Sequence, residues 1–291
     1  MRFAVFHTNQ AVGLAVANSD NIFRGFLSHE PGYPGPLEAL LSSSHSGLER
    51  AAAQLGTGPV VALDNVTLLP PLPRPGKIIC VGLNYIDHSL ESGFAVPSYP
   101  TIFARFASRL IGAGAPIIRP RVSTQLDYEG ELVAIIGKPG RHIAEADALT
   151  HVIGYSLFNE ASVRDYQTKS PQWTVGKNFD GTGAFGPFFV TADELPPGAR
   201  GLRLQTRLNG VVVQDASTDD MVFSVAQLIS ILSTAMSLSP GDIIVTGTPS
   251  GVGMARKPPL YMKPGDICEV EVEGLGILRN PIADEDGPPA N

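Results

Sequence analysis

Short apolar runs separated by glycine and proline dominate this sequence and limit what it can fold into. Its 291 residues include 31 glycines and 25 prolines, which favour many turns and therefore short strands. Apolar segments rich in branched and aromatic residues, each bounded by turn residues, predict strands. These segments are KIICVGLNY (77–85), LVAIIGK (132–138), HVIGYSLFN (151–159), GPFFV (186–190), LQTRLNGVVVQ (204–214), DIIVTGT (242–248) and ICEVEVEG (267–274).

Helices are fewer in this pattern. The segment SVAQLISILSTAM (224–236) has apolar residues at helical spacing and stops before Pro240-Gly241, which predicts one long helix. A second helix is expected from Pro36 to Gln54. Asn209-Gly210 lies between two strand-like runs and predicts a hairpin. Because strands outnumber helices and do not alternate with them, we expect an α+β fold with a curved mixed sheet.

A proline-rich stretch divides the chain into two unequal parts. LPPLPRPGK (69–77) contains four prolines, which fix φ and remove backbone donors, so it predicts an extended connector. We therefore expect a small N-terminal domain over residues 1–70 and a larger domain over residues 71–291.

Composition excludes several classes of protein. With 21 basic and 28 acidic residues the net charge is -7, which argues against nucleic-acid binding, because that requires a basic face. The N-terminus does not resemble a signal peptide and no apolar run is long enough to span a membrane. Cys80 and Cys268 each lie in an apolar segment, where two buried thiols are expected rather than a disulfide. We therefore expect a cytoplasmic protein that binds a small-molecule partner.

Three acidic residues lie at the start of a segment that would be apolar on both faces of a strand. In LDYEGELVAII (126–136), Asp127, Glu129 and Glu131 alternate, so on one continuous strand they would share a face at a spacing of roughly 6.5 Å. Carboxylates at the mouth of a buried strand must be neutralised or bind a cation. A solvated strand face is the alternative, and it is the one we assign to the glutamates of CEVEVEG (268–274).

An oxygen-only site would select Mg²⁺ or Mn²⁺, with Ca²⁺ as a further candidate, over zinc. Glu160 ends another apolar strand and could provide a third carboxylate.

His88 and Glu91 are three residues apart, which places them on one helical face, as a general base and its orienting acid or as a surface ion pair. Lys177 lies among turn residues, where most lysines are exposed.

Two glycine-rich segments do not qualify as nucleotide-binding motifs. GTGAFG (181–186) matches G-x-G-x-x-G, but a strand-like segment rather than a helix follows it. GTPSGVG (247–253) follows a strand but lacks the Gly-Lys-Ser/Thr ending of a P-loop. Its backbone amides or the hydroxyl of Thr248 could still bind an oxyanion.

Taken together, these segments resemble the fumarylacetoacetate hydrolase family over residues 75–283, with a smaller, variable domain before them. The matching motifs keep their order and spacing. They are GLNYIDH (82–88), DYEGEL (127–132), GYSLFNEASVRDYQ (154–167), QWTVGKNFDGTGAFGP (172–187), LNG with Gln214 (208–214) and PGDIIVTGTPSGVG (240–253).

The resemblance implies a β-sheet roll whose mouth holds Mg²⁺ or Mn²⁺ on Glu129, Glu131 and Glu160, the last where members commonly have aspartate. It implies a catalytic dyad of His88 and Glu91 together with an active-site lysine at Lys177. It also implies a homodimer. Residues implied near the substrate are Arg164, Gln167, Thr248 and, in place of the lysine that relatives often have, Arg105.

The implied activity is hydrolytic cleavage of a C–C bond in a 2,4-dioxo acid of the acylpyruvate type, in the catabolism of aromatic or sugar acids. Decarboxylation of a β-keto acid such as oxaloacetate, or isomerisation or hydration of an oxo-diacid, could use the same metal site and stays open. A non-catalytic metal-binding scaffold protein is the alternative of another class, although His88 and Lys177 are both present.

Overall fold

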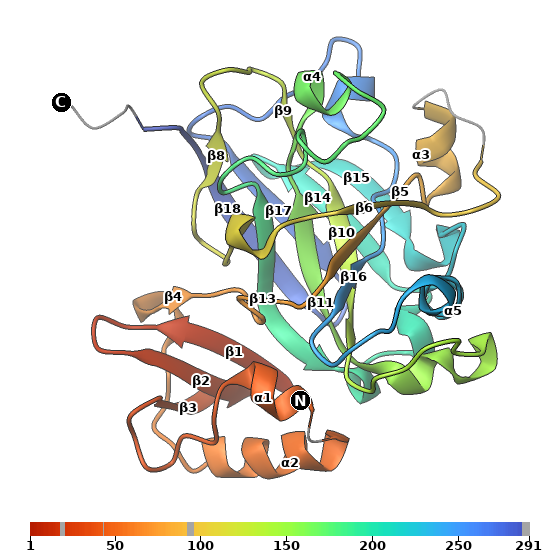
Figure 1. The fold of residues 1–291 in the computed structure, drawn as a ribbon. Coiled ribbons are helices and arrows are strands. Elements are labelled where there is room, and N and C mark those ends of the chain that lie inside the picture. The colour runs from red at the N-terminus through yellow and green to blue at the C-terminus, as the bar shows by residue number, and fades with distance from the viewer. Residues whose placement is uncertain (18–20, 43, 92–95, 287–291) are drawn as a thin grey trace.

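The fold is built on two β-sheets that pack face to face (Figure 1). The computed structural model describes residues 1–17, 21–42, 44–91 and 96–286. The larger sheet has 11 strands in the order β3-β2-β1-β13-β11-β10-β16-β5-β6, with β4 beside β1 and β7 beside β13. Its strands are β1 (Arg2–His7), β2 (Val12–Ala17), β3 (Phe23–Leu27), β4 (Thr67–Leu68), β5 (Ile78–Gly82), β6 (Thr101–Ala104), β7 (Leu110–Ile111), β10 (Gly130–Ile136), β11 (Val152–Glu160), β13 (Gly183–Thr191) and β16 (Ile243–Val245).

The second sheet has five strands in the order β15-β14-β17-β18-β8, and a short ladder joins β12 to β9. These strands are β8 (Ile117–Arg119), β9 (Leu126–Asp127), β12 (Ser162–Val163), β14 (Arg203–Leu208), β15 (Val211–Ser217), β17 (Ile267–Val272) and β18 (Gly276–Asp284). One core cluster contains Leu132 of β10 and Leu157 of β11 together with Leu204 of β14 and Val270 of β17, so the two sheets enclose it.

Strand β10 is buried on both faces, as its sequence predicts. All seven residues are buried. Leu132, Ala134 and Ile136 face the core between the sheets, whereas Val133 and Ile135 belong to the cluster on the other side. The strand pairs antiparallel with β11 and β16, and β16 pairs parallel with β5, which makes the sheet mixed. The predicted α+β class is confirmed.

Helices are fewer than strands among the described residues. They are α1 (Leu37–Leu41), α2 (Ser44–Leu55), α3 (Ile86–Glu91), α4 (Arg164–Gln167) and α5 (Val225–Ala235). Short 3-10 helices occupy Leu63–Asn65, Ala107–Arg109, Glu145–His151, Ala192–Glu194, Pro197–Ala199, Thr218–Asp220 and Gly253–Ala255. Among the described residues, no helix is long and apolar enough to cross a membrane.

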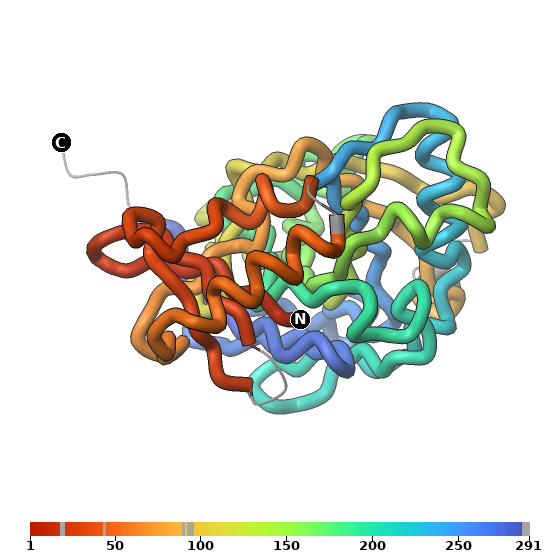
Figure 2. Tube along the Cα trace, turned by 90° about the horizontal axis from the view of Figure 1, so that it is seen from below, coloured from red at the N-terminus to blue at the C-terminus, as the bar shows by residue number. Residues whose placement is uncertain are grey.

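Helix α5 confirms the predicted long helix, and its N-terminus is closed by a capping box between Ser224 and Gln227. The single helix expected over residues 36–54 is wrong, because α1 ends at Leu41 and α2 starts at Ser44, and residue 43 lies outside the described residues. In Figure 2 the two orange helices lie in front of the red strands β1–β3 and cover their outer face.

Two further local predictions agree with the structure. Asn209 and Gly210 both adopt positive φ, of 52° and 78°, and connect β14 to β15 as a tight hairpin. Cys80 and Cys268 are buried and free.

The N-terminal strands continue the larger sheet instead of forming a separate one. Strand β1 pairs antiparallel with β13, with Arg2 opposite Val190 and Phe3 opposite Phe189. Phe3 shares a core cluster with Val133 of β10. The boundary near residue 70 stays a prediction, but the two parts of the chain share one sheet and one core.

Candidate active site

Three buried glutamates converge where β10 begins and β11 ends. One carboxylate oxygen from each of Glu129, Glu131 and Glu160 lies within 4.8 Å of the others, an arrangement that could hold a metal ion. The backbone of Glu160 donates to the carbonyl of Glu129, which brings the two strand ends together. These are the three carboxylates that the sequence predicts as metal ligands.

The single strand expected to present Asp127, Glu129 and Glu131 on one face is wrong. Strand β9 ends at Asp127 and β10 starts at Gly130, so residues 128 and 129 interrupt the alternation. A Cβ at Gly130 would lie 2.1 Å from Thr206 Oγ1, so the start of β10 packs directly against the second sheet. Asp127 does not belong to the glutamate cluster and accepts from Arg164 and from backbone amides.

The three glutamates do not share one electrostatic environment. Burial opposes ionisation of Glu129, but Arg164 and Lys177 outweigh it and lower the pKa of that carboxyl to about 2. Burial, together with the negative charges of Glu160 and Glu129, raises the pKa of Glu131 well above its ordinary value. The cluster thus contains a carboxylate whose charge is poorly compensated by the protein.

Lys177 is buried between two of these glutamates rather than exposed. Its Nζ lies 2.5 Å from Glu129 Oε2 and 3.0 Å from Glu160 Oε2. Burial lowers the pKa of Lys177, but the two carboxylates reverse that effect and raise it. An ammonium has three donors, so one remains for a ligand.

His88 and Glu91 form the expected pair on α3. His88 Nδ1 lies 3.0 Å from Glu91 Oε1, and the carboxylate of Glu91 also accepts from the backbone of Gly251 at 2.9 and 3.0 Å. Because an ionised carboxylate can only accept, Nδ1 carries a hydrogen, and in the neutral imidazole Nε2 is then the atom with the lone pair. His88 is 7% exposed and lines the same cavity as the glutamates.

The glycine-rich loop after β16 binds carboxylates of the protein itself. The backbone of Gly247 donates to Glu131 Oε2 at 2.6 Å, that of Gly251 to Glu91, and that of Gly253 to Asp127 Oδ1 at 2.7 Å. Thr248 Oγ1 donates to the carbonyl of Gly130 at 3.0 Å, so its hydrogen is not available to stabilise an oxyanion. These three amides therefore position acidic side chains of the protein.

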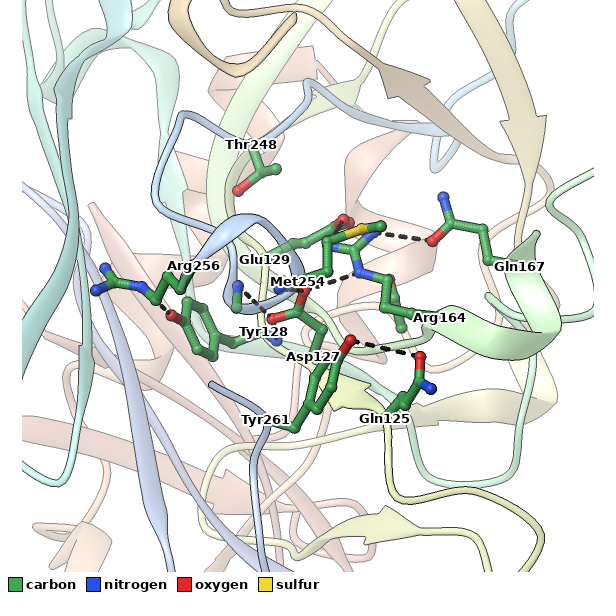
Figure 3. Close-up of polar contacts among 12 residues, drawn as sticks. Gln125, Asp127, Tyr128, Glu129, Arg164, Gln167, Thr248, Met254, Arg256 and Tyr261 are labelled. Carbon is green, nitrogen blue, oxygen red and sulfur yellow. Dashed lines mark hydrogen bonds and ion pairs between the residues drawn. The ribbon is translucent and has the colours of Figure 1, made fainter. Parts of the chain in front are cut away.

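Arg164 links the cluster to its surroundings. Nε donates to Asp127 Oδ2 at 2.8 Å, Nη1 donates to Gln167 Oε1 at 2.8 Å, and Nη2 lies 2.6 Å from Glu129 Oε1 (Figure 3). Arg105 lies behind the cluster, with Nη1 3.8 Å from Glu160 Oε1 and Nη2 donating to Thr182. It is absent from the cavity lining, so the structure does not bring it together with the other predicted substrate contacts.

One cavity of about 230 Å³ is lined by all the other residues predicted for the site. They are His88, Glu91, Glu129, Glu131, Glu160, Arg164, Gln167, Lys177 and Thr248. The cavity also has an apolar wall that was not predicted from the sequence, formed by Val81, Phe103, Trp173 and Met254. These side chains carry no chemical signature in the sequence, so only the fold could reveal them.

The donor set fits a hard divalent cation. Glu160 Oε1 is buried and has no hydrogen-bond partner, so the protein leaves its lone pairs unsatisfied. Carboxylate oxygens are the ligands that Mg²⁺, Mn²⁺ and Ca²⁺ prefer. A cation here would compensate the charge of Glu131, which the protein leaves poorly balanced.

Residues 77–283 match the family model for the fumarylacetoacetate (FAA) hydrolase C-terminal domain, which is well over half of the chain. The chain belongs to the fumarylacetoacetate hydrolase family. Members of this family typically depend on a divalent metal ion, in agreement with the carboxylate cluster.

Individual family members resemble the chain over nearly its whole length. "Oxaloacetate tautomerase fahd2, mitochondrial" of Xenopus laevis is 38% identical, covering 97% of this chain and 90% of its own. The solved fumarylacetoacetate hydrolase (EaFAH) of Exiguobacterium antarcticum has a TM-score of 0.85 at 34% identity, covering 98% and 100%. The maleylpyruvate hydrolase of Sphingobium sp. SYK-6 has a TM-score of 0.81 at 28% identity, covering 98% and 100%. Fumarylacetoacetate hydrolase family members thus include enzymes named for different reactions.

Proposed function

We propose that this protein is a metal-dependent tautomerase that interconverts the keto and enol forms of oxaloacetate or a closely related 2-oxo diacid. The observation that carries the proposal is the position of the His88–Glu91 pair in the same cavity as the three glutamates and Lys177. The near full-length similarity to a protein named oxaloacetate tautomerase supports this substrate. The proposal replaces C–C hydrolysis, which the sequence analysis placed first, with the isomerase alternative.

The residues present can perform both proton transfers of a tautomerisation. A divalent cation on the glutamates would supply a Lewis acid that polarises the 2-oxo group and acidifies the C3 hydrogens. His88 Nε2 is then the base that takes a proton from C3, while Glu91 holds the imidazole through Nδ1 and stabilises the imidazolium. The electron pair of the C3–H bond becomes the C2=C3 bond.

Lys177 is placed to complete the reaction. Two of its three donors are engaged by Glu129 and Glu160, and the third can donate to the oxygen that changes from carbonyl to enol. The oxygen receives one proton as C3 loses one, so substrate and product are isomers. Exchange with solvent then restores the protonation of His88 and Lys177.

The experiment supplies the purified protein with Mn²⁺ and with oxaloacetate dissolved as its enol, and follows the decay of enol absorbance. We expect faster decay than in buffer with Mn²⁺ alone, and a loss of roughly 100-fold or more in the His88→Asn variant. Carbon dioxide release is measured in parallel. Catalysed decarboxylation without faster enol decay would contradict the proposal.

C–C hydrolysis remains a second candidate, because a histidine paired with a carboxylate can also activate water. The structural similarity to maleylpyruvate hydrolase favours this reaction for the same pair. Incubation with acetylpyruvate distinguishes the two candidates, since a hydrolase releases pyruvate and acetate whereas a tautomerase leaves the carbon skeleton intact.

A further inference from the structure

Asp127 is a buried carboxylate beside the cluster that the proposed chemistry does not use. It is 0% exposed and ends strand β9. Its two oxygens accept from four donors, namely Arg164 Nε at 2.8 Å and the backbone amides of Tyr128, Gly253 and Met254 at 2.9, 2.7 and 2.9 Å. A fully satisfied buried carboxylate of this kind fixes the positions of its donors.

The first consequence of these bonds concerns Gln167. A guanidinium can only donate, so the side chain of Gln167 must present its amide oxygen to Arg164 Nη1. The NH₂ group, at the other end of the same amide, does not bind Arg164, and Gln167 lines the cavity. Figure 3 shows Arg164 between Asp127 and Gln167 in this arrangement. Arg164, which Asp127 holds through Nε, therefore sets which end of the Gln167 amide is available to a ligand.

The second consequence concerns the glycine-rich loop. Met254, whose own amide binds Asp127, and the next residue, Ala255, both line the cavity. Gly253 has no space for a side chain, since a Cβ would lie 1.9 Å from the carbonyl oxygen of Leu260 and 2.5 Å from Asp127 Oδ1. The same carboxylate thus holds both the Arg164–Gln167 helix and the loop that forms part of the wall.

We infer that Asp127 is a positioning residue of the cavity: acting through Arg164, it keeps the amide NH₂ of Gln167 directed at the ligand, where it donates to a carboxylate oxygen of a 2-oxo acid. Asp127 itself does not touch the ligand. The inference rests on the proposed function only in taking a 2-oxo acid as the ligand.

Trp173 provides a readout that does not depend on turnover. It is the one tryptophan of the chain and it lines the cavity, so its fluorescence reports ligand binding. Oxalate serves as the probe, because it presents adjacent carboxylate oxygens as a 2-oxo acid does and cannot tautomerise. Calorimetry measures the Mn²⁺ affinity of each variant first, so that every oxalate titration is performed with the metal site saturated.

The test is a double-mutant cycle between Asp127→Asn and Gln167→Met. We expect each single variant to weaken oxalate binding roughly tenfold, the size associated with one hydrogen bond to a charged group. The double variant should bind oxalate with the same affinity as the weaker-binding single variant, because both changes remove the same donor. Arg164→Lys, which leaves the loop amides on Asp127 but lacks the planar fork, should behave as Gln167→Met does.

Asp242→Asn is the matched control. Asp242 is 1% exposed and binds Lys77 at 2.8 Å, so the variant also removes a buried, paired carboxylate without touching the cavity. We expect it to lower thermal stability and to leave oxalate affinity unchanged.

The inference is overturned if the effects of Asp127→Asn and Gln167→Met add to about a hundredfold, or if oxalate affinity in Asp127→Asn matches that of the control. If Asp127→Asn does not fold, a double-mutant cycle between Arg164→Lys and Gln167→Met replaces it. Additive losses of oxalate affinity in that cycle overturn the inference equally. Failure of the proposed function is a different result: the wild-type protein would bind oxalate with the predicted coupling but would not accelerate the decay of the oxaloacetate enol.

Discussion

Glu131 carries the charge that the protein compensates least, because it is buried and its carboxyl faces Glu160 and Glu129. We expect Glu131→Gln to lower Mn²⁺ affinity at least tenfold, since a neutral amide is a poorer ligand. In the absence of metal the melting temperature should not fall, because glutamine can still accept from Gly247 and the repulsion is removed. Calorimetry and thermal unfolding measure both effects.

Glu271→Gln is the matched control for this substitution. Glu271 lies on the half-exposed face of β17 and accepts from Arg207 at 2.6 Å. It does not line the cavity. It should leave Mn²⁺ affinity unchanged. Equal Mn²⁺ affinity in Glu131→Gln and the wild type would contradict the assignment of Glu131 as a ligand.

Lys177 is the internal counter-cation of Glu129 and Glu160. Replacing it with methionine keeps the length of the side chain but leaves buried carboxylates without their partner, which destabilises the metal-free protein by about 3 kcal/mol. Mn²⁺ should restore much of this loss, because a cation in the cluster provides the missing positive charge. Urea denaturation with and without Mn²⁺ tests the prediction, and an equal loss in both conditions would argue against it.

At the scale of elements, the glycine-rich loop depends on backbone amides that approach carboxylates closely. A Cβ at Gly253 would overlap the carbonyl of Leu260, so Gly253→Ala must displace the loop from Asp127. We expect a loss of about 2 kcal/mol in the free energy of unfolding and weaker oxalate binding by Trp173 fluorescence. Gly56→Ala is the control, since a Cβ there meets nothing closer than 3.3 Å. Wild-type oxalate affinity in Gly253→Ala would exclude a role of the loop in shaping the cavity.

Local patterns predicted those elements whose cause is local. The Asn209-Gly210 hairpin, the capped helix α5 and the pairing of His88 with Glu91 each follow from residues within a few positions of one another. Asp127 could not be placed in this way, because its donors Arg164 and Gly253 lie 37 and 126 residues away along the chain. The family resemblance supplied the ligand set, whereas the interruption at residues 128 and 129 and the apolar wall emerged only from the fold.

At the scale of the whole molecule, the family model covers residues 77–283, yet the sheet does not end there. Strand β1 extends it beyond β13, and the Phe3 ring lies 5.9 Å from that of Phe189. Since this contact is buried and belongs to a core cluster shared with β10, the two parts of the chain should unfold in one cooperative transition.

Phe3→Ala tests this coupling. The ring is 0% exposed, so its removal should lower the free energy of unfolding by about 3 kcal/mol. Because Trp173 lies in the larger part of the chain, its fluorescence transition should shift together with the far-ultraviolet circular dichroism. Phe106→Ala, at a ring that is 52% exposed, should shift neither. An unchanged Trp173 transition in Phe3→Ala would show that the N-terminal strands unfold independently, and the shared core would then contribute nothing to holding the cavity in place.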